Sequence, residues 1–319
     1  MKTAVIAIAL LGLVAGASAL NFDEFTAKYS KAYVSMDERA ARKAIFTANV
    51  AEVQRLNAEA KANGGEEVFG MSPFLDMTKE EFSVRLGLKG DLGFDASVPV
   101  HQHSNLKSAP AEIDWRQKGA VTPVKNQEQC GSCWAFSATE SIESCNFVAG
   151  NKLDVLAPEQ IVDCDTTCNG CQGGLPSSAF QYVMGAGGQE WSKDYPYTAG
   201  GGQAGQCQFK KSDVAETIRG WSYATQEKSE TAMMDAMATK GPLSVCVDAS
   251  AWQFYSGGVM QPSSCGTQLD HAVQAVGYTS QYWIVRNSWG ESWGEQGYIR
   301  LAYGQNTCGV AQLPTYCTA

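Results

Sequence analysis

The eleven cysteines of this chain all lie downstream of residue 129. In a secreted protein, such a concentration of cysteines predicts a disulfide framework, which restricts the folds open to that part of the chain. Because eleven is an odd number, at least one thiol must stay unpaired or pair with another chain. The cysteine pattern therefore separates a cysteine-free first part from a cross-linked second part with a thiol left over.

Residues 1–19 have the features of a secretory signal peptide. Lys2 precedes an apolar run from Ala4 to Val14, and the segment ends in the A-x-A signature Ala17-Ser18-Ala19. A membrane anchor is the weaker interpretation, because the run is shorter than the ~20 residues that span a bilayer. We predict cleavage after Ala19 and a protein of the secretory pathway, secreted or held in the lumen of a lysosome or vacuole, with no membrane attachment.

Length and composition indicate a globular protein of two folding units. The chain has 319 residues, of which 44% are hydrophobic and 18% are charged, which favours two domains, at least one with a substantial core. Its formal charge is −9, so it offers no polycationic face for phosphates or anionic lipid. We therefore expect no nucleic-acid partner.

The first unit is predicted to be helical. Apolar residues recur near helical spacing between residues 22 and 88, at Phe25, Tyr29, Ala44, Ile45, Val50, Val53 and Leu56. Gly64-Gly65 is expected to end the longest helix. Thr78 with Glu81 three residues later predicts a capping box that starts another helix.

Residues 89–108 lack both helical and strand periodicity and are rich in Gly, Ser and polar residues, which predicts an exposed linker and a processing site. Beyond it, Cys133 opens a helical segment through Phe147. Strand-like runs follow at 243–249, 272–278 and 282–289. We therefore predict an α+β domain over residues 109–319, preceded by a helical unit and linker over residues 20–108.

Cys133 is the strongest candidate for a reactive thiol. It follows Gly131-Ser132 at the start of a predicted helix, where free N–H groups and the helix dipole favour thiolate over thiol. The alternatives are half of a disulfide, or a redox or metal pair with Cys130. A Cys/His zinc site is disfavoured because residues 109–319 contain a single histidine.

That histidine, His271, lies at the start of an apolar strand and is the one candidate for histidine acid–base chemistry in the second unit. Asn287 can accept a hydrogen bond from its ring and so fix the ring's orientation. Trp289 is expected to cover this hydrogen bond and exclude water.

Together these segments resemble the papain and cathepsin family of cysteine peptidases. The family's motifs occur in the family's order through nearly all of residues 109–319: IDWRQKGAVTPVKNQ (113–127), CGSCWAFS (130–137), EQIVDC (159–164), GCQGGLP (170–176), DYPY (194–197), LDHAVQAVGY (269–278) and NSWGESWGEQGYIR (287–300). The resemblance implies two lobes, one helical and one a β-barrel, that face each other across a cleft.

By this resemblance Cys133 is the nucleophile, His271 the general base and then acid, and Asn287 the residue that orients His271. Gln127 lies six residues before Cys133, as the family requires for an amide that donates to the oxyanion together with the Cys133 backbone N–H. The implied activity is endopeptidase cleavage of polypeptides through a thioester, without metal or cofactor.

The resemblance also implies a substrate-binding surface. Gly131, Gly173, Gly174 and Trp289 are expected to line the cleft, with the glycines leaving room for an extended substrate backbone. An apolar pocket would favour an apolar residue at the second position before the scissile bond. Its walls are Leu175, Pro176, Cys246, Ala272 and Leu313.

The family's disulfides correspond here to Cys130–Cys171, Cys164–Cys207 and Cys265–Cys308. Cys246 is expected to be a free thiol in the apolar pocket. For a fourth bridge we predict Cys145–Cys168, which leaves Cys317.

The first unit resembles the family's inhibitory propeptide. An ERFNIN pattern is formed by Glu38, Arg42, Phe46, Asn49, Val53 and Asn57, with Val53 in place of Ile. A second motif is present as Gly70, Phe74 and Asp76, with Ser72 replacing Asn. We expect a monomer inhibited by its own propeptide and released by acid.

Two departures from the family pattern lie in the cleft: Glu128 replaces the usual Gly, and Gln172 replaces Asn. Two other functions are open at this point. A catalytically inactive binding or storage protein could share the scaffold, and a disulfide oxidoreductase would bond Cys130 to Cys133.

Overall fold

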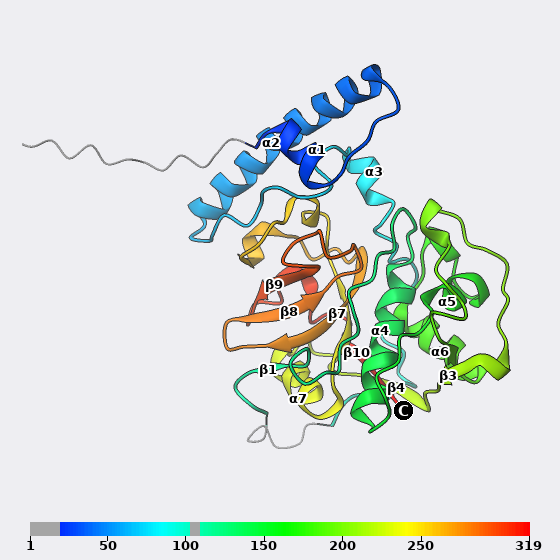
Figure 1. Cartoon of the computed structure of the whole chain (residues 1–319). Helices are drawn as coiled ribbons and strands as arrows, with labels where there is room; N and C mark the ends of the chain where they lie inside the picture. The colour runs from blue at the N-terminus through cyan, green and yellow to red at the C-terminus, as the bar shows by residue number, and fades with distance from the viewer. Residues whose placement is uncertain (1–19, 103–108) are drawn as a thin grey trace, which may run out of the picture.

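The computed structural model describes residues 20–102 and 109–319. The predicted signal peptide, its cleavage site and the end of the predicted linker lie outside these residues. Figure 1 shows a group of helices, α1 to α3, at one end of a two-lobed body. Within the described ranges, no helix is both long and apolar enough to cross a membrane.

The N-terminal unit consists of α1 (Phe22–Lys28), α2 (Met36–Ala62) and α3 (Lys79–Ser83). Each helix begins at a side-chain cap, from Asn21, Ser35 and Thr78 respectively, and the predicted Thr78–Glu81 capping box is present. Helix α2 ends two residues before Gly64, whose φ of 77° suits glycine. The sequence prediction of this helical unit is therefore confirmed.

One lobe of the body is helical. It contains α4 (Cys133–Val148), α5 (Pro158–Cys164) and α6 (Pro176–Ala186), the short turns η1 (Gly170–Gln172), η2 (Ala199–Gly201) and η3 (Lys211–Asp213), and the strand pair β2 (Gln189–Glu190) and β3 (Val214–Glu216). Helix α4 is buried along nearly its whole length. It is thus the central helix of the body rather than an amphipathic surface helix.

The other lobe is built on an eight-stranded sheet of order β4-β10-β5-β7-β8-β9-β6, with β1 paired to β7. Its strands are β1 (Ile113–Asp114), β4 (Gly220–Tyr223), β5 (Leu243–Val247), β6 (Val259–Met260), β7 (His271–Tyr278), β8 (Tyr282–Arg286), β9 (Tyr298–Ala302) and β10 (Thr315–Thr318). Helix α7 (Glu230–Lys240) and the turns η4 (Trp252–Phe254), η5 (Pro262–Ser264) and η6 (Thr307–Gly309) complete it. The α+β class is confirmed, with strands in the three predicted runs.

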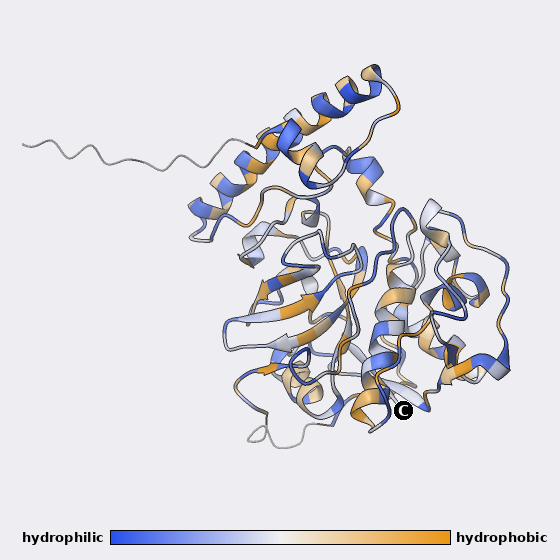
Figure 2. Ribbon diagram, viewed as in Figure 1, coloured by the Kyte–Doolittle hydropathy of each residue, from blue (hydrophilic) through white to orange (hydrophobic). Residues whose placement is uncertain are grey.

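The core of the N-terminal unit is continuous with the core of the sheet lobe. Phe22, Phe25 and Phe46 belong to the same buried cluster as the strands. The contact runs through Phe74 and Phe82, whose rings meet Trp289 edge-on at 5.7 and 5.2 Å. In Figure 2 helix α2 carries many hydrophilic residues between its apolar ones, so the unit packs on the body through part of its surface.

The predicted linker is exposed over residues 89–97, as expected, whereas residues 98–101 pack against the body. Val100 pairs with Tyr223 in parallel, and two backbone hydrogen bonds, from His101 N–H and to Pro99 O, flank that pair. The His101 ring is buried, and its Nε2 lies 2.8 Å from Asp235 Oδ2. The prediction of an exposed linker was therefore wrong only for residues 98–101, because β4 is an edge strand whose free backbone groups pair with a further strand.

Four disulfides connect Cys130 to Cys171, Cys164 to Cys207, Cys265 to Cys308 and Cys145 to Cys317. The first three coincide with the expected pairs, and the first excludes the Cys130–Cys133 bond of an oxidoreductase. Cys246 is a free thiol, as predicted.

The predicted Cys145–Cys168 bridge was wrong. Cys145 lies near the end of α4, where its Cα is 6.2 Å from that of Cys317 on β10. Cys168 is free and lies instead beside Gly174, close enough that a Cβ on that glycine would be 2.6 Å from its sulfur. The pairing follows the packing of α4 on β10, which connects residues far apart in the sequence.

Candidate active site

Cys133 is the first residue of α4 and is a free, fully buried thiol. Burial raises its pKa to about 12, and hydrogen bonds from the backbone of Ala272 and Gly87 only partly oppose this shift. The lowered pKa expected at a helix N-terminus is therefore not found in this closed form, because desolvation outweighs the helix dipole. The sulfur is held as a neutral thiol.

His271 is the first residue of β7, on the opposite lobe, and its side chain is completely buried. Its Nε2 lies 2.8 Å from Asn287 Oδ1. Because that oxygen can only accept, Nε2 carries the proton and Nδ1 presents its lone pair. Nδ1 has no hydrogen-bond partner among the described residues, so it is available to take a proton from a nearby group.

The environment of His271 keeps the ring neutral and fixed. Burial lowers its pKa to about 4, although the bond to Asn287 acts in the opposite direction. The Trp289 ring lies over it, with centroids 4.8 Å apart and an angle of 30° between the planes. Trp289 is thus placed to shield the His271–Asn287 bond from water.

The two candidate catalytic groups meet through Ala272. Cys133 lies in one buried cluster with Ala272, the residue that follows His271 on β7. Helix α4 and strand β7 therefore bring a thiol and an imidazole from different lobes to one place.

Gln127 lies in the loop before α4 and is buried. Its Nε2 donates to Arg85 O at 2.9 Å and to Cys130 O at 2.8 Å. Its Oε1 accepts from Ser288 Oγ at 2.7 Å, which fixes the orientation of the amide. Sequence reasoning did not select Ser288, although it directly follows Asn287 in the same motif.

The expected apolar pocket is present and is filled by Leu88. This leucine is buried in a cluster with Cys133, Cys246 and Ala272, with Leu175, Leu269 and Leu313 packed around it. A space of about 30 Å³ remains nearby, lined in part by Pro176. The structure thus brings together all five predicted pocket residues and adds Leu269, which the sequence analysis did not include.

Residues 85–89 occupy the cleft as an extended segment. Leu88 pairs with Gly174 in parallel: Gly174 N–H donates to Gly87 O at 3.0 Å, and Lys89 N–H donates to Gly174 O at 3.1 Å. On the other side, Leu88 N–H donates to Asp270 O at 3.0 Å. The segment therefore forms hydrogen bonds with both lobes.

The fit of this segment requires glycines on both sides. A Cβ on Gly87 would lie 1.9 Å from Gly131 O, and one on Gly173 would lie 2.7 Å from Gly87 O. The backbones approach so closely that no substrate can share the space. None of these cleft-filling residues was selected from the sequence.

Comparisons with known proteins agree with this geometry. Residues 109–318 match the model of the papain family cysteine proteases, and residues 22–82 match the cathepsin propeptide inhibitor domain. Cysteine proteinase 1 of Dictyostelium discoideum is 39% identical over 314 residues, covering 92% of this chain and 90% of the relative. Digestive cysteine proteinase 3 of Homarus americanus is 40% identical over 332 residues and covers 100% of both chains.

Solved structures of precursors are also similar. The digestive procathepsin L2 proteinase from the larval midgut of Tenebrio molitor matches with a TM-score of 0.84 and 34% identity, over 93% of this chain and 98% of that one. The recombinant stem bromelain precursor matches with a TM-score of 0.81 and 35% identity, over 93% and 97% of the two chains.

Proposed function

The chain belongs to the papain family of cysteine proteases, and we propose that it is the zymogen of a secretory-pathway endopeptidase in which Cys133, His271, Asn287 and Gln127 perform catalysis. The observation that carries this proposal is the closed cleft. The Cys133 thiol is packed with Leu88 and with Ala272, the neighbour of His271, so residues 85–89 must leave before any substrate can bind.

In the proposed mechanism, removal of residues 20–108 exposes the cleft to water and relieves the burial that keeps both groups neutral. The Cys133 proton then moves to His271 Nδ1, and the thiolate attacks the substrate carbonyl carbon. Gln127 Nε2 and the Cys133 backbone N–H donate to the resulting oxyanion. Gln127 is prepared for this task, because Ser288 fixes its amide and its Nε2 already donates to a carbonyl, that of Arg85.

Collapse of this intermediate breaks the peptide bond and leaves a thioester on Cys133. His271 gives its proton to the departing amine, and then takes one from the water that hydrolyses the thioester. Asn287 holds the ring through both transfers by its 2.8 Å contact with Nε2. The free thiol is regenerated at the end of the cycle.

Leu88 supports the proposed preference for an apolar residue at the second position before the scissile bond. Its side chain is 6% exposed and packs against the apolar side chains of Cys246, Ala272 and Leu175. A cationic substrate side chain would lose its hydration there without a carboxylate partner.

The ERFNIN residues support an inhibitory role for the first unit. Asn49 Nδ2 donates to the carbonyls of Leu75 and Met77, and Asn57 bonds Phe69 through both atoms of its amide. Arg42 donates to Asp76 O and to Glu81. These bonds hold residues 69–77 along α2, while Ser72 reaches the body through its bond to Gln253 O.

We further propose that residues 1–19 direct the chain into the secretory pathway and that the mature enzyme is a monomer secreted or held in a lysosomal or vacuolar lumen. The apolar leader and the four disulfides support an oxidising route.

The test is to activate the full chain with acid, add an epoxide inactivator of thiol peptidases, and map the adduct by mass spectrometry. We expect a single label on Cys133 and loss of hydrolysis of peptides with an apolar second residue, with Cys133→Ala as the unlabelled control. Labelling of Cys168 or Cys246 in place of Cys133, or no hydrolysis between pH 4 and 8, would refute the proposal.

A further inference from the structure

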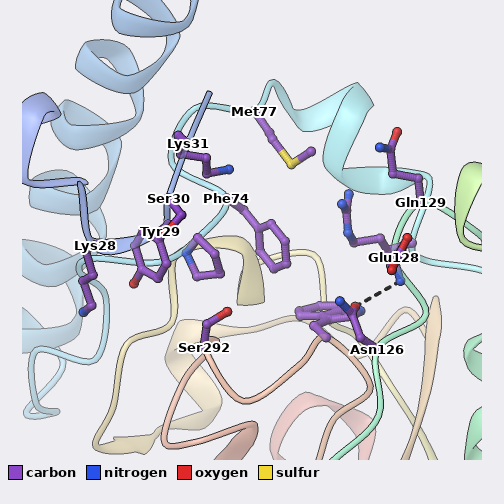
Figure 3. A pocket seen from close by; sticks show the side chains of 13 residues that line it. Lys28, Tyr29, Ser30, Lys31, Phe74, Met77, Asn126, Glu128, Gln129 and Ser292 are labelled. Carbon is purple, nitrogen blue, oxygen red and sulfur yellow. Dashed lines mark hydrogen bonds between the residues drawn. The ribbon is translucent and has the colours of Figure 1, made fainter. Parts of the chain in front are cut away.

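Glu128, where the family usually has glycine, adopts a left-handed backbone conformation with φ of 54°. A glycine would take this conformation without strain, whereas a residue with a side chain is strained here. The Glu128 backbone N–H donates to Asn126 Oδ1 at 3.0 Å, shown as the dashed line in Figure 3. The side chain is exposed, and its carboxylate lies beside Gly200, where a Cβ would come within 2.3 Å of Glu128 Oε2.

Glu128 lines a pocket of about 530 Å³ between the propeptide and the body. Figure 3 shows Phe74, Met77 and Lys31 of the propeptide on one side and Asn126 and Ser292 of the body on the other. The body contributes Asn126, Glu128, Gln129, Trp289 and Ser292. Among these described residues, Glu128 is the only charged one.

The propeptide places a cation in this pocket. Arg85 is 6% exposed, and its guanidinium carbon lies 4.8 Å from the centre of the Phe74 ring. Burial lowers the pKa of Arg85, while the charges of Glu128 and Glu81 act in the opposite direction. Glu128 thus offers a stabilising charge to a largely desolvated arginine.

The position of Arg85 shows on which side of Cys133 this pocket lies. Leu88 fills the apolar pocket on one side of Cys133. Three residues earlier, the Arg85 carbonyl meets the Gln127 amide, and its side chain shares a pocket with Trp289. This is the side of the nucleophile opposite to the apolar pocket, where the leaving part of a substrate must lie.

We propose that Glu128 makes the leaving-group side of the mature cleft selective for a lysine or arginine in one of the first two residues after the scissile bond. Once the propeptide leaves, Trp289 provides an aromatic wall for this site. Glu128 provides the only charge among the described body residues that line the pocket. The inference rests on the proposed function and extends it to the substrate class.

The first experiment compares pairs of quenched fluorescent peptides cleaved by the activated enzyme. Both members keep leucine before the scissile residue, and one carries Arg and the other Glu in the first two positions after the bond. We expect kcat/KM to favour the Arg peptide about fivefold or more, and this ratio to decrease as salt is added. The ratio cancels any general change in activity.

Variants assign the preference to one side chain. Glu128→Gln should bring the ratio close to one, and Glu128→Lys should reverse it. Glu291→Gln, which removes the same charge from an exposed residue beside the Ser292 wall, should keep the wild-type ratio. Equal hydrolysis of both peptides by the wild type, or equal loss of preference in the Glu128→Gln and Glu291→Gln variants, would overturn the proposal.

The second experiment needs no activity. Thermal unfolding of the full-length zymogen is measured for wild type, Arg85→Met, Glu128→Gln and the double variant. We expect the two changes in unfolding temperature to be non-additive, with Arg85→Met lowering that temperature less in the Glu128→Gln background than in the wild type. If no peptide is hydrolysed, the proposed function fails and this cycle alone decides the role of Glu128. Additive shifts of the unfolding temperature would overturn the proposed role of Glu128.

Discussion

In the closed cleft, Cys133 and His271 are both buried and neutral, with pKa values near 12 and 4 respectively. Between about pH 4 and its ordinary value near 6.5, His271 binds fewer protons in the closed form, so acid favours opening. Burial raises the Asp270 pKa to about 7, so this carboxyl binds more protons in the closed form over much of the same range, and acid favours closing. Because the two effects oppose each other, acid release must depend largely on other groups.

The intact zymogen should therefore resist thiol alkylation at Cys133. Since burial holds the pKa near 12 and the thiolate is the reactive form, iodoacetamide should leave Cys133 unmodified at pH 8, where the acid-processed enzyme reacts readily. Peptide mass mapping before and after processing measures this. Cys168, a half-buried free thiol, is the internal reference, and equal labelling of Cys133 in both forms would contradict the desolvated state.

Gln127→Ala should lower kcat by ~10²–10³ with little change in KM, because the lost amide acts on the oxyanion rather than on the bound substrate. Steady-state kinetics of the processed variant tests this. Gln129→Ala, an exposed neighbour, is the matched control. A change confined to KM would place Gln127 in substrate binding instead.

Helices α2 and α3 are joined by a charged contact, in which Arg42 Nη1 lies 2.7 Å from Glu81 Oε2. The hydrogen bond from Arg42 is the largest cause that lowers the pKa of Glu81. A lowered carboxyl pKa adds stability that is present above the ordinary value near 4.3 and is lost as pH falls through the lower folded value. Since both side chains are partly exposed, the contribution is modest, and it acts below about pH 4.5.

Glu81→Gln should accordingly accelerate activation at pH 5 to 6, where the Arg42–Glu81 pair of the wild type is intact. Below pH 5 the variant's activation rate should depend less on pH than that of the wild type. Glutamine can keep the capping box but not the ion pair. Activation rates across this pH range measure the effect, with Glu80→Gln on the same helix as control. Identical pH profiles for wild type and Glu81→Gln would count against this contact as an acid sensor.

The segment after the cleft provides a second attachment, because residues 99–101 extend the sheet at β4 and His101 contacts Asp235 of α7. His101→Ala should accelerate activation about tenfold, since it removes a buried contact to a carboxylate. The mature enzyme should keep its kcat/KM if processing removes residue 101. Gln102→Ala, an exposed neighbour, is the control, and equal rates for both variants would show that the contact does not restrain the propeptide.

At the scale of the whole molecule, the two lobes and the propeptide form one packed body. Cys145–Cys317 joins the central helix α4 to strand β10 across 172 residues of sequence. The apolar cluster that begins at Phe22 continues into the sheet lobe. Stability and inhibition therefore share contacts, and loss of the propeptide exposes apolar surface around Trp289.

Replacing both Cys145 and Cys317 by alanine should lower the free energy of unfolding by about 2–4 kcal/mol, because the bridge restricts the unfolded chain. Cleavage activity of the folded enzyme should be retained, since neither residue lies in the cleft. Denaturant unfolding measures the change, with Cys168→Ser as a control that removes a free thiol. Equal unfolding midpoints for the two variants would contradict a structural role for this disulfide.

The sequence alone predicted the helical first unit, the α+β second unit and a set of candidate site residues that lacked Ser288, Leu269 and the cleft-filling segment. Short-range signals suffice for these, because a capping box, an alternating strand and a motif spacing are local. Through the family resemblance, the sequence also indicated that Cys246 is a free thiol and predicted three of the disulfides.

Only the tertiary structure decided how distant segments meet. The packing of α4 on β10 selected Cys317 rather than Cys168 as the partner of Cys145. Residues 99–101, predicted to be part of an exposed linker, pair with the open edge of β4. Burial beneath residues 85–89 raised the pKa of Cys133, although a lowered pKa was expected. Desolvation depends on what covers a group, and no local sequence pattern records that.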